Sequence, residues 1–487
     1  MYIDSARHLA DGQGYFTKIY CGVKAPVIKW PPLFPALLST LDIFGIDPLP
    51  GARWLNALLF GANILLVGLI IYNVTKGSFY IPILGSFLML SSTVMLNVHS
   101  MAWTEPLFIF LGFLGLFLLT LYIQNKSRLY LIAASVVIAL AYLDRYTGIT
   151  LVVTGITGTL FLSQKKDYNR FIDSAIFVVI SIFPTILLSI RNYYIAGHMA
   201  GQRPTEPITL ERFNSLIISI SSWLLPGSEI FNILPAQDTV IRIFLIIVSL
   251  ALLLITIQLL SRKAGRSGGK PIKLHLARTP FLFLIFLLAY IVLVIAVVAF
   301  FDSNVQLDNR ILSPAYVAAL ILVLYLLHKF FHSSIRHYLQ LALILVGATF
   351  AVMYLAAAMA WITYSHFNGR QYTNKVWQGL DISKELEIFS AETLFFSNYH
   401  EFIYFQTGRP ACPVESLNNI DISGSTKLKS EHADVVVVQF NIEPKYAFKN
   451  EFPYNARREI RLEKRFSVLP IVEKTNMSIY KITPRID

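Results

Sequence analysis

Residues 103–123 read WTEPLFIFLGFLGLFLLTLYI. After Glu105, the next eighteen residues carry no charged side chain, and a helix of roughly that length crosses the hydrocarbon core of a bilayer. Composition extends this character to the whole chain, because 55% of its 487 residues are hydrophobic and only 14% are charged. A soluble domain carries roughly 25% charged residues. The sequence therefore predicts a polytopic integral membrane protein.

Nine further apolar stretches bring the number of expected membrane spans to ten. Two of the ten are short, and Asp144, Arg145 and Tyr146 lie between them, which indicates a tight polar turn at a membrane face. Trp30–Ile46 is also apolar, but it is rich in proline and contains Asp42, so we expect a re-entrant or interfacial helix there. The ten spans are Trp54–Tyr72, Tyr80–Asn97, Pro106–Ile123, Leu129–Leu143, Thr147–Leu162, Ile172–Ile190, Val240–Leu260, Phe281–Phe301, Ile311–Leu327 and Tyr338–Trp361.

Lysine and arginine concentrate in alternate connections between these spans. Cytoplasmic loops of membrane proteins are enriched in both residues, so the alternation orients the chain across its membrane. Residues 1–53 and everything after Trp361 are then extracytoplasmic. The same pattern explains the formal net charge of +12 without a nucleic acid as partner. The basic positions are Lys76; Lys126 and Arg128; Lys165, Lys166 and Arg170; Arg262, Lys263, Arg266, Lys270, Lys273 and Arg278; Lys329 and Arg336.

We expect an α-helical polytopic membrane protein with a small C-terminal α/β domain. Residues 1–53 form a first extracytoplasmic loop with interfacial helices, residues 54–362 a transmembrane helical domain, and residues 363–487 a soluble extracytoplasmic α/β domain. This last part is polar and of ordinary domain size. Its pattern predicts strands at Thr393–Ser397, Phe402–Gln406, Asp434–Phe440 and Met477–Ile482, with helices near Val376–Phe389 and Tyr454–Lys464.

The beginning of the chain carries two further expectations. Residues 1–29 are polar and contain no signal peptide, so a span upstream of Met1 is expected to carry them across, which would give the working protein at least eleven spans. Cys21 and Cys412 are both expected outside the cytoplasm, where disulfides form. A disulfide between them and two unrelated free thiols are both compatible with the sequence.

Polar side chains at the expected outer face are the candidates for chemistry, because polar groups at membrane depth are costly. Glu105 opens a span, where a carboxylate either acts chemically or compensates the helix dipole. Arg145 follows Asp144 in a turn that could equally hold a local ion pair. Arg310 opens a late span, where its guanidinium either binds a phosphate in bidentate fashion or reaches the interface as a long cation.

The order of these groups resembles the glycosyltransferase C superfamily. It is most similar to the protein O-mannosyltransferase-like branch, which includes the bacterial aminoarabinose transferase acting on lipid A. The resemblance covers most of residues 2–361. The matching positions are Tyr2, Ala6, Leu9, Gly12 and Gly14; Pro31, Pro32 and Leu33; Glu105; Arg145 within Asp-Arg-Tyr-Thr-Gly; and Arg310 with Pro314.

The resemblance implies transfer of a sugar from a polyprenyl-phosphate donor to a lipid, glycan or protein acceptor, at the outer face of a bacterial inner (plasma) membrane. It implies that Arg310, Arg145 and Lys29 bind the donor phosphate, and that Glu105 acts in catalysis or helps hold a divalent cation such as Mg²⁺ or Mn²⁺. The family's principal catalytic Asp would precede Met1, so either that carboxylate lies upstream of this sequence or Asp4 substitutes for it. Lys29 lies one residue from the family's basic position. The expected substrate groove comprises Tyr2, Trp30, Pro31, Pro32, His99 and Trp103.

Two other classes remain open. An O-antigen ligase or polymerase also has many spans and large outer loops, and the long connection Arg191–Asp238 is compatible with one. A lipid or solute transporter is the second alternative. Transporters often carry charges in the middle of their spans, whereas here polar residues gather at one face, which favours interfacial chemistry.

Overall fold

The computed structural model describes most of the chain, and by its contacts the chain forms two compact units. Unit 1 joins Met1–Val27 to Ile362–Asp487, and unit 2 is Ile28–Trp361. The expected first loop, residues 1–53, is thus divided between the two units. The described residues are 1–163, 165–201, 210–227, 241–247, 278–302, 305–331, 337–419, 435–440, 466–474 and 476–484.

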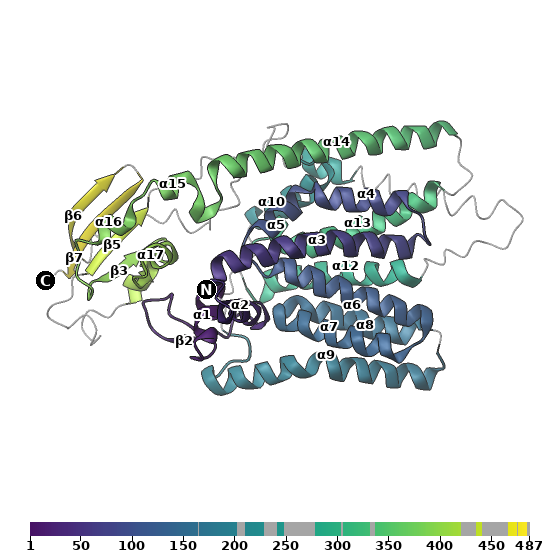
Figure 1. The fold of residues 1–487 in the computed structure, drawn as a ribbon, viewed down its shortest axis with the longest axis horizontal. Coiled ribbons are helices and arrows are strands. Elements are labelled where there is room, and N and C mark those ends of the chain that lie inside the picture. Colours follow the sequence, from purple (N-terminus) through teal and green to yellow (C-terminus); the bar gives the residue numbers. More distant parts are fainter. Residues whose placement is uncertain are drawn as a thin grey trace, which may run out of the picture. The chain divides into compact units, whose positions relative to one another are not determined.

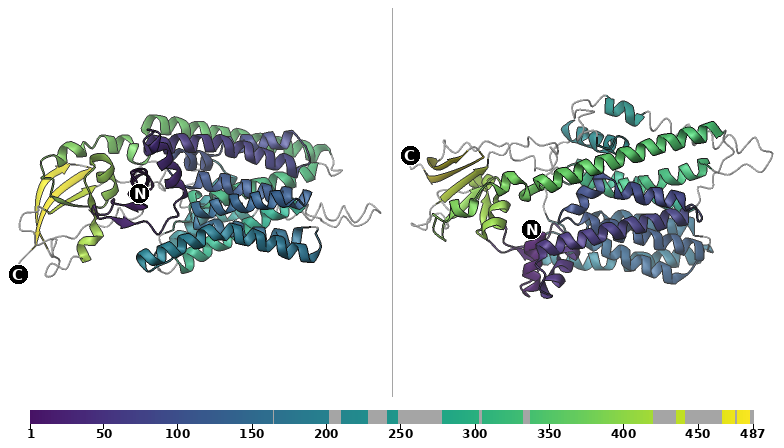
Figure 2. Two further views of the ribbon diagram at one scale, coloured as in Figure 1. Left: turned by 60° about the horizontal axis from the view of Figure 1, so that its bottom comes forward. Right: turned by 45° about the horizontal axis from the view of Figure 1, so that its top comes forward.

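Unit 2 is a bundle of apolar helices that run alongside one another (Figures 1 and 2). Neighbours in the bundle include α6 with α7, α7 with α9, and α12 with α13. The long α14 continues into unit 1. The helices are α2 (Leu33–Ile43), α3 (Pro48–Val74), α4 (Tyr80–Leu90), α5 (Thr93–Ser100), α6 (Glu105–Asn125), α7 (Arg128–Asp144), α8 (Ile149–Thr157), α9 (Asp167–Ala196), α10 (Leu210–Leu224), α12 (Arg278–Phe300), α13 (Asn309–Phe331) and α14 (His337–Asn368).

Six of the described helices are long and apolar enough to cross a membrane, and the bent pair α4–α5 would make a seventh. These seven coincide with expected spans, which supports an integral membrane protein. The two short expected spans are helical as well. The first is α7, which has 17 residues. The second, Tyr146–Leu162, is a continuous apolar helix that consists of a 3-10 turn, α8 and a π-helical turn. Of the expected span Val240–Leu260, only residues 241–247 are described, and they are helical.

Local sequence explains where several helices begin and bend. The Asp47 carboxylate accepts a hydrogen bond from the Leu49 amide, and proline follows Asp47 at the first helical position, so α3 begins there. Tyr80–Ser100 bends by 55° at Ser91 and Ser92, because the Ser92 hydroxyl caps a new helix by accepting from the Met95 amide. The expected helix in Trp30–Ile46 is α2, which is too short to cross a bilayer.

Unit 1 is built on a five-stranded sheet with the order β4-β3-β5-β7-β6. The pairs β3–β4 and β3–β5 are parallel, whereas β5–β7 and β6–β7 are antiparallel. The N-terminal residues add a helix and a two-stranded ribbon. The elements are α1 (Tyr2–Ala10), β1 (Phe16–Thr17), β2 (Ala25–Pro26), α15 (Lys375–Gln378), α16 (Ile382–Leu386), β3 (Leu394–Ser397), α17 (His400–Thr407), β4 (Ala411–Pro413), β5 (Val435–Phe440), β6 (Phe466–Lys474) and β7 (Met477–Pro484).

The central strand β5 begins with four valines, and both of its faces are covered. Val436 and Val438 point into one buried cluster, which also contains Trp377. Val435 and Val437 belong to a second cluster on the other face, which contains Cys412. Four consecutive buried valines are typical of a strand that is packed on both sides.

The structure corrects one expected strand and adds four others. Phe402–Gln406 is helical and lies within α17, not in a strand. Phe402 and Ile403 are buried there, and this helix provides the crossover that the parallel strands β3 and β4 require. The strands β1, β2, β4 and β6 were not predicted. The expected helix Tyr454–Lys464 lies outside the described residues.

A disulfide joins Cys21 to Cys412, 391 residues later in the chain. The Cys21 amide also donates a hydrogen bond to the Ala411 carbonyl at 3.1 Å, and Tyr20 bridges to Ala411 in parallel fashion. The disulfide hypothesis is therefore confirmed, and it explains why the first 27 residues belong to unit 1.

Candidate functional site

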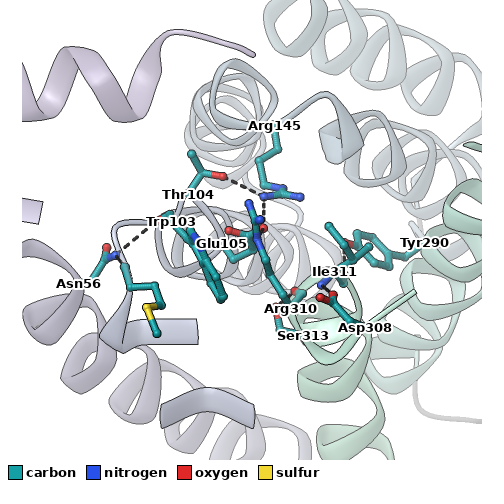
Figure 3. Close-up of polar contacts among 11 residues, drawn as sticks. Asn56, Trp103, Thr104, Glu105, Arg145, Tyr290, Asp308, Arg310, Ile311 and Ser313 are labelled. Carbon is teal, nitrogen blue, oxygen red and sulfur yellow. Dashed lines mark hydrogen bonds and ion pairs between the residues drawn. The ribbon is translucent and has the colours of Figure 1, made fainter. Parts of the chain in front are cut away.

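Glu105 holds two arginines at the start of α6 (Figure 3). Its Oε1 atom lies 2.5 Å from Nη1 of Arg145 and 2.7 Å from Nε of Arg310. The Glu105 side chain is 1% exposed. Three residues that are far apart in the sequence thus form one charge cluster, in which a buried carboxylate is paired with two cations.

Each member of the cluster comes from the end of a different helix. Glu105 begins α6, Arg145 follows the last residue of α7, and Arg310 lies in the first turn of α13. Arg145 also donates from Nη1 to the Thr104 hydroxyl at 2.9 Å. The guanidinium of Arg310 lies 4.5 Å from the centroid of the Trp103 ring, an arrangement that stabilises a cation on an aromatic face.

Buried amides hold the backbone before α6 in place. The side-chain nitrogen of Asn56 donates to the carbonyls of Met101 and Trp103. The side chain of Asn63 contacts His99 Nε2 at 3.0 Å and the Pro106 carbonyl at 3.1 Å. His99, expected in a substrate groove, is buried here between α3 and the start of α6, and its Nδ1 lies 2.8 Å from the Met95 carbonyl.

The start of α13 is fixed in a similar way, which positions Arg310. The Asp308 carboxylate accepts a hydrogen bond from the Ile311 amide at 3.0 Å, as a helix-capping group does. The Ser313 hydroxyl donates to the Arg310 carbonyl. From α12, the hydroxyl of the fully buried Tyr290 donates to the Ile311 carbonyl at 2.7 Å.

Several carboxylate oxygens near the arginines are buried without a hydrogen-bond partner within the described residues. They are Oε2 of Glu105 and both oxygens of Asp144, whose residue is 1% exposed. A buried polar atom without a partner costs free energy. Asp144 is the last residue of α7, and the negative end of the helix dipole destabilises a carboxylate there. Such costs are more common at functional sites than in ordinary cores.

The accessible part of the cluster is cationic. The side chains of Arg145 and Arg310 are 14% and 32% exposed, whereas the Glu105 carboxylate behind them is almost fully covered. Paired guanidiniums with a fixed orientation suit a phosphate or carboxylate ligand. The cluster can therefore receive an anion at helix ends.

Asp4 and Tyr2 lie in α1 of unit 1. Oδ2 of Asp4 accepts hydrogen bonds from the Thr17 hydroxyl at 2.6 Å and the Lys18 amide at 2.9 Å, and Oδ1 accepts from the Tyr404 hydroxyl at 2.6 Å. Burial opposes the charge of Asp4, but these hydrogen bonds outweigh burial and lower the pKa of its carboxyl. Asp4 therefore links the N-terminal segment to α17 as a carboxylate.

Lys29, Trp30, Pro31 and Pro32 lie in unit 2, just before α2. Pro31 is buried, and the other three side chains are partly exposed. Pro32 stands at the position that precedes the first residue of α2, where its missing amide hydrogen costs nothing.

The donor set around Glu105 does not suit a divalent cation. Two guanidiniums already pair with this carboxylate. Within the residues that the structure describes, no group of three or more His, Cys, Asp or Glu side chains could hold a metal ion.

The main members of the cluster were predicted from the sequence. The structure brings these four residues together: Glu105, Arg145, Arg310 and Trp103. Sequence reasoning omitted the groups that position them, including Asn56 and Tyr290. These two are single polar residues within otherwise apolar stretches, and that isolation is the signal that could have pointed to them.

The fold resembles that of the membrane enzyme ArnT. The chain is similar to the crystal structure of ArnT from Cupriavidus metallidurans in the apo state, with a TM-score of 0.53 and 12% identity over 99% of this chain and 92% of that one. ArnT is an aminoarabinose transferase. A second ArnT crystal structure from the same organism, bound to undecaprenyl phosphate, aligns over the same shares with a TM-score of 0.43 and 11% identity. No protein-family model and no curated protein match the sequence.

Proposed function

We propose that this chain is a membrane glycosyltransferase that moves a sugar from a polyprenyl-phosphate donor to an acceptor outside the cytoplasm. The observation that carries the proposal is the pair of guanidiniums, Arg145 and Arg310, that Glu105 holds together where three helices begin or end. The ArnT-like fold supports the same class, since ArnT has been crystallised with undecaprenyl phosphate.

In the proposed reaction, the bond between the anomeric carbon of the sugar and the phosphate oxygen breaks. Polyprenyl phosphate leaves with the electron pair, and its negative charge is stabilised by Arg145 and Arg310. Lys29 is a third proposed cation for this phosphate. Glu105 acts as a positioning residue, because its carboxylate lies behind the guanidiniums and fixes their orientation.

The acceptor hydroxyl forms the new bond to the anomeric carbon and gives up its proton to a base. Glu105 accepts a hydrogen bond from Arg310, and Asp4 accepts one from the Tyr404 hydroxyl. These bonds make each carboxylate a weak base, so neither is assigned the role of accepting the proton. The proposed groove residues within unit 2 are Trp103, Trp30, Pro31, Pro32 and His99.

The test uses full-length protein reconstituted in liposomes. Undecaprenyl phosphate carrying a radiolabelled sugar is the donor, and an extract of bacterial envelope lipids and glycans is the acceptor pool. We expect release of undecaprenyl phosphate together with label in an acceptor product. Arg310→Ala is expected to abolish both signals while the protein stays folded.

The same assay separates the alternatives. Movement of intact lipid or solute across the liposome membrane, without a product, would indicate a transporter. Transfer of a preassembled glycan chain from a diphosphate carrier, but not of a single sugar from a monophosphate carrier, would indicate a ligase or polymerase. Either outcome would overturn the proposed transfer of a single sugar from a monophosphate carrier.

A further inference from the structure

A second buried carboxylate holds cations at the other end of the helix bundle. Tyr122 lies seventeen residues beyond Glu105 in α6, which is about 25 Å along the helix axis. Its hydroxyl donates to Oδ2 of Asp173 in α9 at 2.7 Å. Asp173 also accepts from Nε of Arg128 at 2.7 Å and from Nζ of Lys165 at 2.6 Å. Its side chain is fully buried, so the two cations have fixed positions.

Asp173 orders these two cations without neutralising both. Asp173 accepts a hydrogen bond from Nε of Arg128, whose side chain is 50% exposed. Further basic residues lie at the same helix ends, and α12 joins them because the Gln124 side chain contacts the Thr279 hydroxyl. We call this group the inner basic cluster: Lys126, Arg128, Lys165, Lys166, Arg170 and Arg278. The described carboxylates beside it are Asp167 and Asp173.

The length of α7 brings this cluster to the level of lipid phosphates. The helix has 17 residues, which is about 25 Å, whereas the hydrocarbon core is about 30 Å thick. Arg128, its first residue, therefore lies near the edge of the core. Large apolar side chains close to the cations in sequence are exposed: Leu129 by 73%, Phe161 by 75% and Phe171 by 67%.

We propose that the inner basic cluster binds an anionic glycerophospholipid of the cytoplasmic leaflet. The lipid phosphate accepts hydrogen bonds from Arg128 and Lys165, and the acyl chains cover Leu129, Phe161 and Phe171. The charge pattern of the sequence predicts that these helix ends lie on the cytoplasmic side, where anionic lipids give the leaflet a negative potential. This inference is independent of the proposed transfer reaction.

The test compares lipid binding to delipidated full-length protein by native mass spectrometry. Phosphatidylglycerol is the anionic probe, and phosphatidylcholine is the neutral one. Two variants weaken the cluster. Arg128→Gln removes the most exposed ordered cation. The double variant Lys126→Asn, Lys166→Gln leaves Asp173 untouched, and asparagine tolerates the left-handed backbone of residue 126. Lys329→Gln in α13 is the matched control.

We expect phosphatidylglycerol to bind more tightly than phosphatidylcholine. A basic residue near the surface contributes about 1 kcal/mol, so Arg128→Gln should weaken phosphatidylglycerol binding roughly fivefold and the double variant roughly 25-fold. Lys329→Gln should bind as the parent does. Equal binding of the two lipids would overturn the proposal, as would unchanged binding by the folded double variant.

Discussion

Replacing Glu105 by glutamine tests how the two arginines of the site are positioned. The substitution keeps the shape of the side chain and removes its charge. In the parent protein, one carboxylate oxygen contacts Arg145 at 2.5 Å and Arg310 at 2.7 Å. In the variant, no carboxylate lies between the two guanidiniums, so they repel each other. The NH₂ group of the glutamine is itself a hydrogen-bond donor and cannot accept from either arginine.

The structure sets the size of the effect. Two unit charges about 4 Å apart attract by about 4 kcal/mol at an effective dielectric constant of about 20, and desolvation offsets much of this. Removal of one partner from a buried pair costs about 3–5 kcal/mol of stability. A displacement of a catalytic group by about 1 Å costs roughly 100-fold in rate. We therefore expect Glu105→Gln to lower the unfolding temperature and to reduce sugar transfer roughly 100-fold.

The assay measures sugar transfer and thermal unfolding on the same preparations. Phe177→Ala is the matched control, because this fully buried ring in α9 packs beside Gly155 and its loss costs about 3–5 kcal/mol without changing a charge. The control should lose similar stability and keep its transfer rate. Normal turnover by folded Glu105→Gln would refute the positioning role, and an equal rate loss in Phe177→Ala would attribute the effect to stability alone.

Three further predictions concern other contacts. Arg310→Lys loses the planar donor geometry and should weaken undecaprenyl phosphate binding by roughly 10-fold, measured by native mass spectrometry; unchanged affinity would contradict phosphate binding there. Cys21→Ser removes the bond to Cys412 and should lower stability by about 2–5 kcal/mol; a reducing agent should have the same effect on the parent in thermal unfolding and none on the variant. The pKa of Asp4 is lowered from its ordinary value of 3.8, so its stabilising contribution is present above about pH 4 and is lost as the pH falls further. Tyr404→Phe removes a donor to Asp4, so the variant should be less stable at neutral pH and lose less on acidification, and identical pH profiles would argue against this contribution.

The helices of unit 2 could be predicted because a long apolar stretch has few alternatives in a bilayer. Residues 106–123 illustrate this, since hydropathy alone placed them within α6. The break between α4 and α5 could not be predicted from hydropathy, because two serines in an apolar stretch barely change its mean hydropathy. Phe402–Gln406 was predicted as a strand because aromatic and β-branched residues favour strands, but the crossover between two parallel strands requires a helix there.

The charge cluster was only partly predictable. Glu105, Arg145 and Arg310 were candidates from the sequence because each opens or closes a span. Their pairing could not be read from the sequence, since 205 residues separate Glu105 from Arg310 and only the packing of α6, α7 and α13 brings them together. For the same reason, a local ion pair within a turn was one interpretation of Arg145 from the sequence. In the structure, Arg145 pairs with Glu105 of another helix.

Sugar transfer by full-length protein tests the central claim most directly. Purified protein in liposomes receives undecaprenyl phosphate bearing a labelled sugar together with an envelope extract, and mass spectrometry follows both the lipid and the label. The proposed function predicts that undecaprenyl phosphate and a labelled acceptor appear together with the parent protein and that neither appears with Arg310→Ala. A donor that remains intact with the folded parent protein, or that is consumed equally by the variant, would contradict it.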